Sequence, residues 1–158
     1  LPTVLYNFSY WTKQSNSKGG GSETEHPYKI LCIQGPQLPV ASMSFGRRDL
    51  FNRLRIFDSI DSAVSSQRAV ELESIDFNET FDLEIDDHAD DIWIRQVFDP
   101  PTIDALVQGT FEIPNIRYYD GTFWLVESGH YDAPELDQML EWQARGTRAI
   151  SHLARVPA

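Results

Sequence analysis

The residues best suited to chemistry lie between Glu71 and Asp91, where ten acidic side chains occur without a lysine or an arginine. Carboxylate oxygens are the ligands that calcium and magnesium prefer in proteins, so this segment could hold a divalent cation. The spacing matches no cation-binding loop, however, because the glycine and the closing glutamate of a calcium-binding hand are missing. The candidate ligands in this segment are Asp86, Asp87, His88 and Asp91.

A second interpretation of the same acids is a solvated surface. Glu71, Glu73, Asp82 and Glu84 alternate with apolar residues, which is the pattern of strands that have one buried and one wet face. We favour this interpretation over a metal site. A divalent-metal-dependent enzyme that uses the acidic residues of segment 86–91 is kept as an alternative function.

One basic cluster follows the apolar run at residues 40–45. An anionic partner, such as a lipid headgroup surface, would suit several neighbouring guanidinium groups. The simpler interpretation, which we favour, is that these arginines balance the acidic half of the same domain. A module that binds an anionic lipid surface is the second alternative function. The members of the cluster are Arg47, Arg48, Arg53 and Arg55.

Other kinds of chemistry have no recognisable motif in this sequence. The chain lacks the Gly-x-Ser-x-Gly turn of a serine hydrolase, and its four histidines do not have the spacing of metal ligands. The glycines at 19–21 are consecutive and lack the strand and helix that flank a phosphate-binding loop. Cys32 lies in an apolar run and is expected to be a buried thiol. We therefore name no catalytic residue and expect no cofactor.

Composition narrows the class of partner. The chain carries a net charge of −11; residues 1–70 hold eight basic and five acidic side chains (+3), and residues 71–158 hold five and nineteen (−14). Nucleic acid binding needs a basic surface, so this balance argues against it. No stretch has the length and apolar character of a membrane span. Because the chain starts at Leu1 without a methionine, we expect a soluble piece of a longer protein or a processed product.

The elements that must position these residues follow from periodicity. Alternation predicts two strands in the central segment, at residues 70–75 and 81–86. The residues between them are too few for a regular helix, so we expect one helical turn or a tight connection. Phe77 and Phe81 would then stack on one side, because side chains four residues apart are neighbours on a helical turn.

Two helices are predicted after the second of these strands. Four acids, Asp86, Asp87, Asp90 and Asp91, crowd the expected start of a helix, where acids interact well with the helix dipole. That helix must end by Asp99, because two prolines follow. A second short helix is expected over residues 102–107, ended by Gly109.

The remaining chain is predicted to form hairpins and a C-terminal helix. A strand at residues 3–13 leads through a flexible tip at about 14–25 to a returning strand at 28–34. This order predicts a single α+β domain, residues 1–158, with an antiparallel sheet built from hairpins and helices packed on one face. The other expected elements are a short apolar run at 40–45, helical turns at 50–57, a surface loop at 58–67, a hairpin around Asp120 and Gly121, and a helix over about 133–153.

Several short motifs give the chain a resemblance to a known family. Across residues 28–145 it resembles a family of uncharacterised bacterial membrane-associated proteins, in which hydrophobic segments near the N-terminus precede a soluble domain. The chain departs from the family pattern at His88, where a proline is usual after the acidic pair. The motifs are Glu73-Ser74-x-x-Phe77-Asn78-x-x-Phe81, Asp86-Asp87, Ile103-Asp104-Ala105-Leu106, Gly121-Thr122-Phe123-Trp124-Leu125 and Asp132-x-x-Glu135-Leu136.

The resemblance implies a cellular context and no reaction. It implies a soluble domain of a membrane-anchored protein, located at the cell membrane on its cytoplasmic side. A protein partner at the membrane is then a natural binding target. We therefore expect a non-catalytic binding or interaction module, of an oligomeric state that the sequence does not determine.

Overall fold

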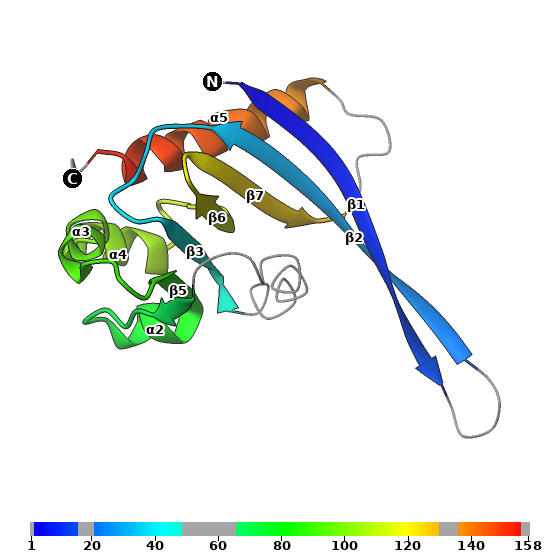
Figure 1. Cartoon of the computed structure of the whole chain (residues 1–158), viewed down its shortest axis with the longest axis horizontal. Coiled ribbons are helices and arrows are strands. Elements are labelled where there is room, and N and C mark those ends of the chain that lie inside the picture. Colours follow the sequence, from blue (N-terminus) through cyan, green and yellow to red (C-terminus); the bar gives the residue numbers. More distant parts are fainter. Residues whose placement is uncertain (1, 16–20, 49–65, 130–135, 156–158) are drawn as a thin grey trace.

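The computed structural model describes residues 2–15, 21–48, 66–129 and 136–155. Its strands form one antiparallel sheet in the order β1-β2-β7-β6-β3-β5-β4 (Figure 1). The predicted α+β class with an antiparallel sheet is confirmed. The strands are β1 (Thr3–Ser15), β2 (Gly21–Gln34), β3 (Ser42–Arg47), β4 (Gln67–Ala69), β5 (Phe81–Asp86), β6 (Ile116–Tyr119) and β7 (Thr122–Ser128). The helices are α2 (Ile75–Thr80), α3 (Asp91–Val97), α4 (Pro100–Val107) and α5 (Leu136–Leu153).

The strands β1 and β2 form a long hairpin that extends beyond the rest of the sheet (Figure 1). Their pairing continues without interruption out to Ser15 and Gly21. The tip expected at residues 14–25 is therefore too long, because the ladder continues through these polar residues. A salt bridge between Lys13 and Glu23, with 2.7 Å between Nζ and Oε1, spans the two strands there.

The hairpin of β6 and β7 turns at Asp120 and Gly121, as the sequence predicts. Both residues have positive φ, 44° and 78°, which is the backbone of the tight turn that suits the twist of a hairpin. The turn is also held from outside the hairpin. The side-chain amide of Gln37 donates to Asp120 Oδ1 at 3.1 Å, and the Gly35 N–H donates to the Gly121 carbonyl at 2.8 Å.

The helices pack on one face of the sheet, as predicted. Alternate strand residues such as Ile33, Phe45 and Leu125 point to this face and are buried. The helix α5 lies over β2 and β7 (Figure 1), and Gly146 allows it to come close. A Cβ at Gly146 would lie only 2.6 Å from Leu125 Cδ2, so a larger residue has no room there.

Four phenylalanines join the short helices to the sheet. Phe45 of β3 lies with its ring centroid 6.2 Å from that of Phe77, 5.4 Å from Phe81 and 5.3 Å from Phe98. The ring centroids of Phe77 and Phe81 are 5.2 Å apart, so the predicted contact is confirmed, but the rings are tilted by 34° and not stacked. Aromatic pairs at such distances stabilise by roughly 0.5–1.5 kcal/mol beyond the area that they bury.

The strand expected at residues 70–75 is wrong. The strand in this region is β4, which ends at Ala69, and the next residues have no regular structure before α2 begins. The side chain of Asn78 takes the place of a neighbouring strand. Its Oδ1 accepts from the Leu72 N–H at 3.0 Å, and its Nδ2 donates to the Leu72 carbonyl at 2.7 Å. Val70 and Leu72 are therefore both buried, as alternation predicts, but only Val70 bonds to β5, through its N–H to the Leu83 carbonyl at 2.9 Å.

The two helices predicted after β5 are confirmed, each with a carboxylate cap. Asp90 accepts from the Ile92 N–H at 2.9 Å, and Asp99 accepts from the Thr102 N–H at 3.0 Å. Each cap satisfies a donor that the first helical turn would otherwise leave unpaired. Gly109, with φ of 70°, follows the end of α4.

Some expectations concern residues outside the described ranges. These are the helical turns at 50–57, most of the loop at 58–67 and the first residues of the C-terminal helix at 133–135. Among the described residues, no helix is both long enough and apolar enough to cross a membrane.

Candidate functional site

Asp86, the first of the candidate metal ligands, has a structural role. It is buried at the end of β5, and each of its oxygens accepts a backbone hydrogen bond. The Ala41 N–H donates to Oδ2 at 2.9 Å, and the His88 N–H donates to Oδ1 at 3.2 Å. This carboxylate therefore ties the start of β3 to the turn that follows β5.

The other candidate ligands are not gathered around Asp86. Asp91 forms an ion pair with Arg68 and a longer one, of 3.9 Å, with Arg95. The hydrogen bond from Arg68 to Asp91 raises the pKa of that guanidinium. Asp87 and His88 are exposed. Within the described ranges, no group of three or more His, Cys, Asp or Glu side chains could hold a metal ion.

The two described members of the arginine cluster differ in environment. Arg48 pairs with Asp82, whose Oδ1 lies 3.0 Å from Nη2 and 3.1 Å from Nε. Arg47 ends β3, and its exposed guanidinium forms no ion pair with any described residue. Arg53 and Arg55 lie outside the described residues. In the described part of this cluster, Arg47 is thus the arginine that offers an unpaired charge.

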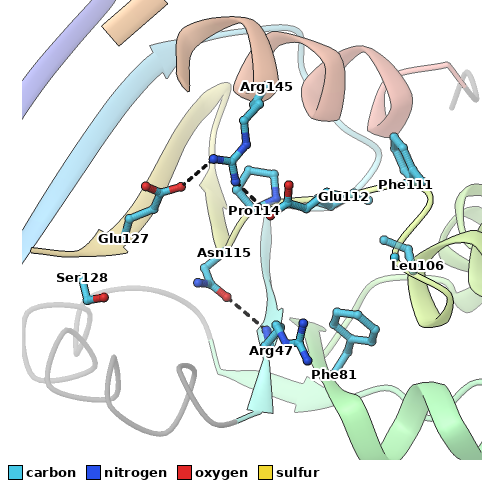
Figure 2. Close-up of a pocket in the computed structure, with 12 residues that line it drawn as sticks. Arg47, Phe81, Leu106, Phe111, Glu112, Pro114, Asn115, Glu127, Ser128 and Arg145 are labelled. Carbon is cyan, nitrogen blue, oxygen red and sulfur yellow. Dashed lines mark hydrogen bonds and ion pairs between the residues drawn. The ribbon is translucent and has the colours of Figure 1, made fainter. Parts of the chain in front are cut away.

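Arg47 lies at the edge of a cavity of about 460 Å³ (Figure 2). The cavity lies between the end of β3, the end of β7, the segment joining α4 to β6, and α5. Small-molecule sites have volumes of roughly 300–1,000 Å³, so this cavity is of suitable size. Its apolar lining comes from Phe81, Leu106, Phe111, Ile113 and Pro114.

Arg145 reaches from α5 to two glutamates on the cavity wall (Figure 2). Its Nη2 lies 2.9 Å from Glu112 Oε1, and its Nη1 lies 3.2 Å from Glu127 Oε1. The Nε atom of Arg145 is buried without a hydrogen-bond partner. Two carboxylates therefore neutralise this guanidinium and fix the position of its outer nitrogens.

Asn115 holds the segment that leads into β6 against the end of β3. Its Oδ1 accepts from the Arg47 N–H at 3.0 Å, and its Nδ2 donates to the Val126 carbonyl at 3.4 Å (Figure 2). The fit requires Gly46, because a Cβ there would lie 2.3 Å from Asn115 Oδ1. The backbone from which the Arg47 side chain starts is therefore well fixed.

Several of the polar groups that line the cavity already have partners. Its described lining contains no histidine, cysteine, lysine or tyrosine, which are common nucleophiles and general bases. The carboxylates of Glu112 and Glu127 are both already paired with Arg145. What remains for a ligand is an apolar wall and the charge of Arg47.

Cys32 is half-buried and not the fully buried thiol that the sequence suggests. It lies on the face of β2 opposite the described helices, because the alternate residues Leu31 and Ile33 point to those helices. Burial raises the pKa of its thiol, which disfavours the reactive thiolate at neutral pH. Nothing in this environment suggests nucleophilic catalysis.

Reasoning from the sequence missed most of the polar cavity residues. Glu112, Asn115, Glu127 and Arg145 are separated along the chain and follow no motif. The sequence analysis singled out Arg47 only as a member of a surface cluster. No local signal connects these residues, since the sheet order and the packing of α5 bring them together.

Comparisons with protein-family models, with curated proteins and with solved structures find no match to this chain.

Proposed function

We propose that this domain is a non-catalytic binding module whose ligand enters the cavity beside Arg47. The observation that carries the proposal is the exposed guanidinium of Arg47, which has no ion pair with any residue that the structure describes and lines a cavity with an apolar wall. A few polar groups around a mainly apolar concave surface are typical of ligand sites. The absence of a convergent nucleophile and base in the described lining favours binding over catalysis.

The metal-dependent enzyme is the less supported alternative. Both oxygens of Asp86 already accept backbone hydrogen bonds, and Asp91 is paired with Arg68. A cation at this segment would have to displace these partners. The lipid-surface module is also less supported, because Arg48 is paired with Asp82 and so offers less free charge to a headgroup.

The membrane context is a separate proposal and rests on the family resemblance alone. We propose that segments outside this chain hold the domain at a bacterial cell membrane, on the cytoplasmic side. A protein partner at that membrane could then present the group that occupies the cavity. Fusing a fluorescent protein to the full-length gene product and observing its location would test this.

The binding function can be tested with nuclear magnetic resonance. A set of small fragments of mixed charge would be added to ¹⁵N-labelled protein, and backbone amide shifts would be followed. We expect saturable shifts at Arg47, Leu106 and Asn115. A variant with a bulky side chain at an exposed lining position, Glu112→Trp, should reduce them while keeping a folded spectrum. Saturable shifts that occur only elsewhere on the domain would refute the proposal.

The same protein serves to test the metal alternative. Melting temperatures would be measured with EDTA and with millimolar calcium, magnesium, manganese or zinc, since an ion that binds only the native state must raise the melting temperature. We expect no rise. A clear rise that Asp87→Asn and Asp91→Asn abolish would instead favour the enzyme.

A further inference from the structure

We infer that the ligand of this cavity is a small amphipathic monoanion, whose carboxylate binds Arg47 and whose apolar body contacts Phe81 and Leu106. The inference rests on the proposed function and specifies the ligand class. It follows from how the charges around the cavity are already paired.

The two described arginines that line the cavity differ in how they are paired. Of the two arginines that line the cavity, Arg145 is held by Glu112 at 2.9 Å and by Glu127 at 3.2 Å. Arg47 has no carboxylate among the described residues and is exposed. A negatively charged group that enters the cavity is therefore attracted to Arg47. A positively charged group would meet a repulsive guanidinium and two acids that already have a partner.

The donors of Arg47 and the acids of the cavity decide which kind of anion fits best. A guanidinium presents a planar fork of N–H donors that matches a carboxylate, and the paired hydrogen bonds are stronger than those between neutral groups. Phosphate also fits such a fork, but it carries close to two negative charges at neutral pH. Glu112 and Glu127 line the same cavity and would repel the additional charge. The cavity therefore favours a carboxylate over a phosphate monoester.

The apolar side chains beside Arg47 indicate what the rest of the ligand is. Phe81 is paired with Arg47 in the ladder of β5 and β3, so the apolar wall begins directly beside the charge. In Figure 2 the side chains of Arg47 and Phe81 lie next to each other, and Leu106 lies above them on the same side. A ligand bound to Arg47 through its carboxylate would thus place an aliphatic or aromatic body against this wall.

The inference can be tested with four ligands that share one chain and differ in their ends: hexanoate, hexanol, hexylammonium and hexyl phosphate. Amide shifts of ¹⁵N-labelled protein would give dissociation constants. For hexanoate, with its few non-hydrogen atoms, we expect a value of about 1 mM. Hexanol and hexyl phosphate should bind at least about threefold more weakly, and hexylammonium should not shift the cavity resonances.

Variants at neighbouring positions supply the control. Arg47→Gln should weaken hexanoate binding by about tenfold, and Arg47→Lys by less, because lysine keeps the charge and loses the fork. Arg48→Gln removes the same charge one residue later, at a side chain that is paired with Asp82. It should leave the affinity within a factor of two.

The outcomes separate the inference from the function on which it rests. Equal affinities of hexanoate and hexanol, unaffected by Arg47→Gln, would overturn the anionic ligand class and leave a cavity that binds apolar molecules. Tighter binding of hexyl phosphate would overturn the preference for a carboxylate. If none of the four ligands shifts resonances around the cavity, both the inference and the binding function are refuted.

Discussion

Replacing Asn78 with alanine should destabilise the domain more than its partly exposed position suggests. The amide of Asn78 accepts from the Leu72 N–H at 3.0 Å and donates to the Leu72 carbonyl at 2.7 Å. Leu72 is only 5% exposed, so its backbone groups gain little access to water when the amide is removed. The side chain of Asn78 thus makes the two backbone hydrogen bonds that a neighbouring strand would otherwise make.

The size of the effect follows from these two hydrogen bonds. Each contributes about 1 kcal/mol net, and a buried polar group left without a partner costs about 1–3 kcal/mol. We therefore expect Asn78→Ala to lower the free energy of unfolding by about 2–3 kcal/mol. In a domain of this size 1 kcal/mol corresponds to about 2–4 °C, so the melting temperature should fall by about 4–12 °C.

Urea denaturation and native-state hydrogen exchange would measure this loss. Asn78→Asp keeps the acceptor but places a carboxylate oxygen, which cannot donate, against the Leu72 carbonyl, so it should cost at least as much as alanine while leaving the Leu72 amide better protected. Glu79→Ala is the matched control, because Glu79 is exposed on the same short helix; it should change the free energy of unfolding by less than about 0.5 kcal/mol. The reasoning fails if Asn78→Ala costs no more than Glu79→Ala, or if exchange at Leu72 is unchanged.

The remaining predictions concern a helix contact, a titrating side chain and a turn. Gly146→Ala should lower the free energy of unfolding by about 1–3 kcal/mol in urea, because the new Cβ would lie 2.6 Å from Leu125 Cδ2. Burial and the charge of Arg155 lower the pKa of His152, so the folded state favours the neutral ring and stability should fall as the pH drops below the ordinary value of 6.5. Melting temperatures at pH 7.5 and 5.5 should show this loss, and His152→Gln should reduce it. Gly121→Ala should cost about 1–2 kcal/mol in urea, because φ of 78° is unfavourable for alanine.

Each of these predictions has an outcome that contradicts it. If Gly146→Ala raises the free energy of unfolding, the helix propensity of alanine outweighs the close contact, and the Leu125 side chain moves aside at little cost. An unchanged difference between the two melting temperatures in His152→Gln would assign the acid sensitivity to the carboxylates. If Gly121→Ala leaves the free energy of unfolding unchanged, the turn has relaxed to another type.

Several elements could be predicted from the sequence because their causes are local. The turn at Asp120 and Gly121 needs two residues that tolerate positive φ, and the sequence provides them side by side. The helix before Pro100 must end there, whatever lies around it. The contact between the rings of Phe77 and Phe81 likewise follows from spacing along the chain.

The strand expected at 70–75 shows the limit of such reasoning. Alternation of apolar and polar residues reports which side chains are buried, and Val70 and Leu72 are indeed buried. Alternation gives no information about which group hydrogen-bonds to the backbone. For the backbone of Leu72 the partner is the side chain of Asn78, six residues later, and the periodicity of apolar residues does not predict it.

The sequence by itself determined the fold class, the presence of the two helices after β5 and the excess of acid in the second half. Each of these depends on residue types at short spacing. Only the tertiary structure decided which charges are free. Arg48 is paired with Asp82, whereas Arg47 has no ion pair within the described part of the chain, although the two are adjacent in the sequence. Pairing depends on which side chains the sheet order brings within about 4 Å.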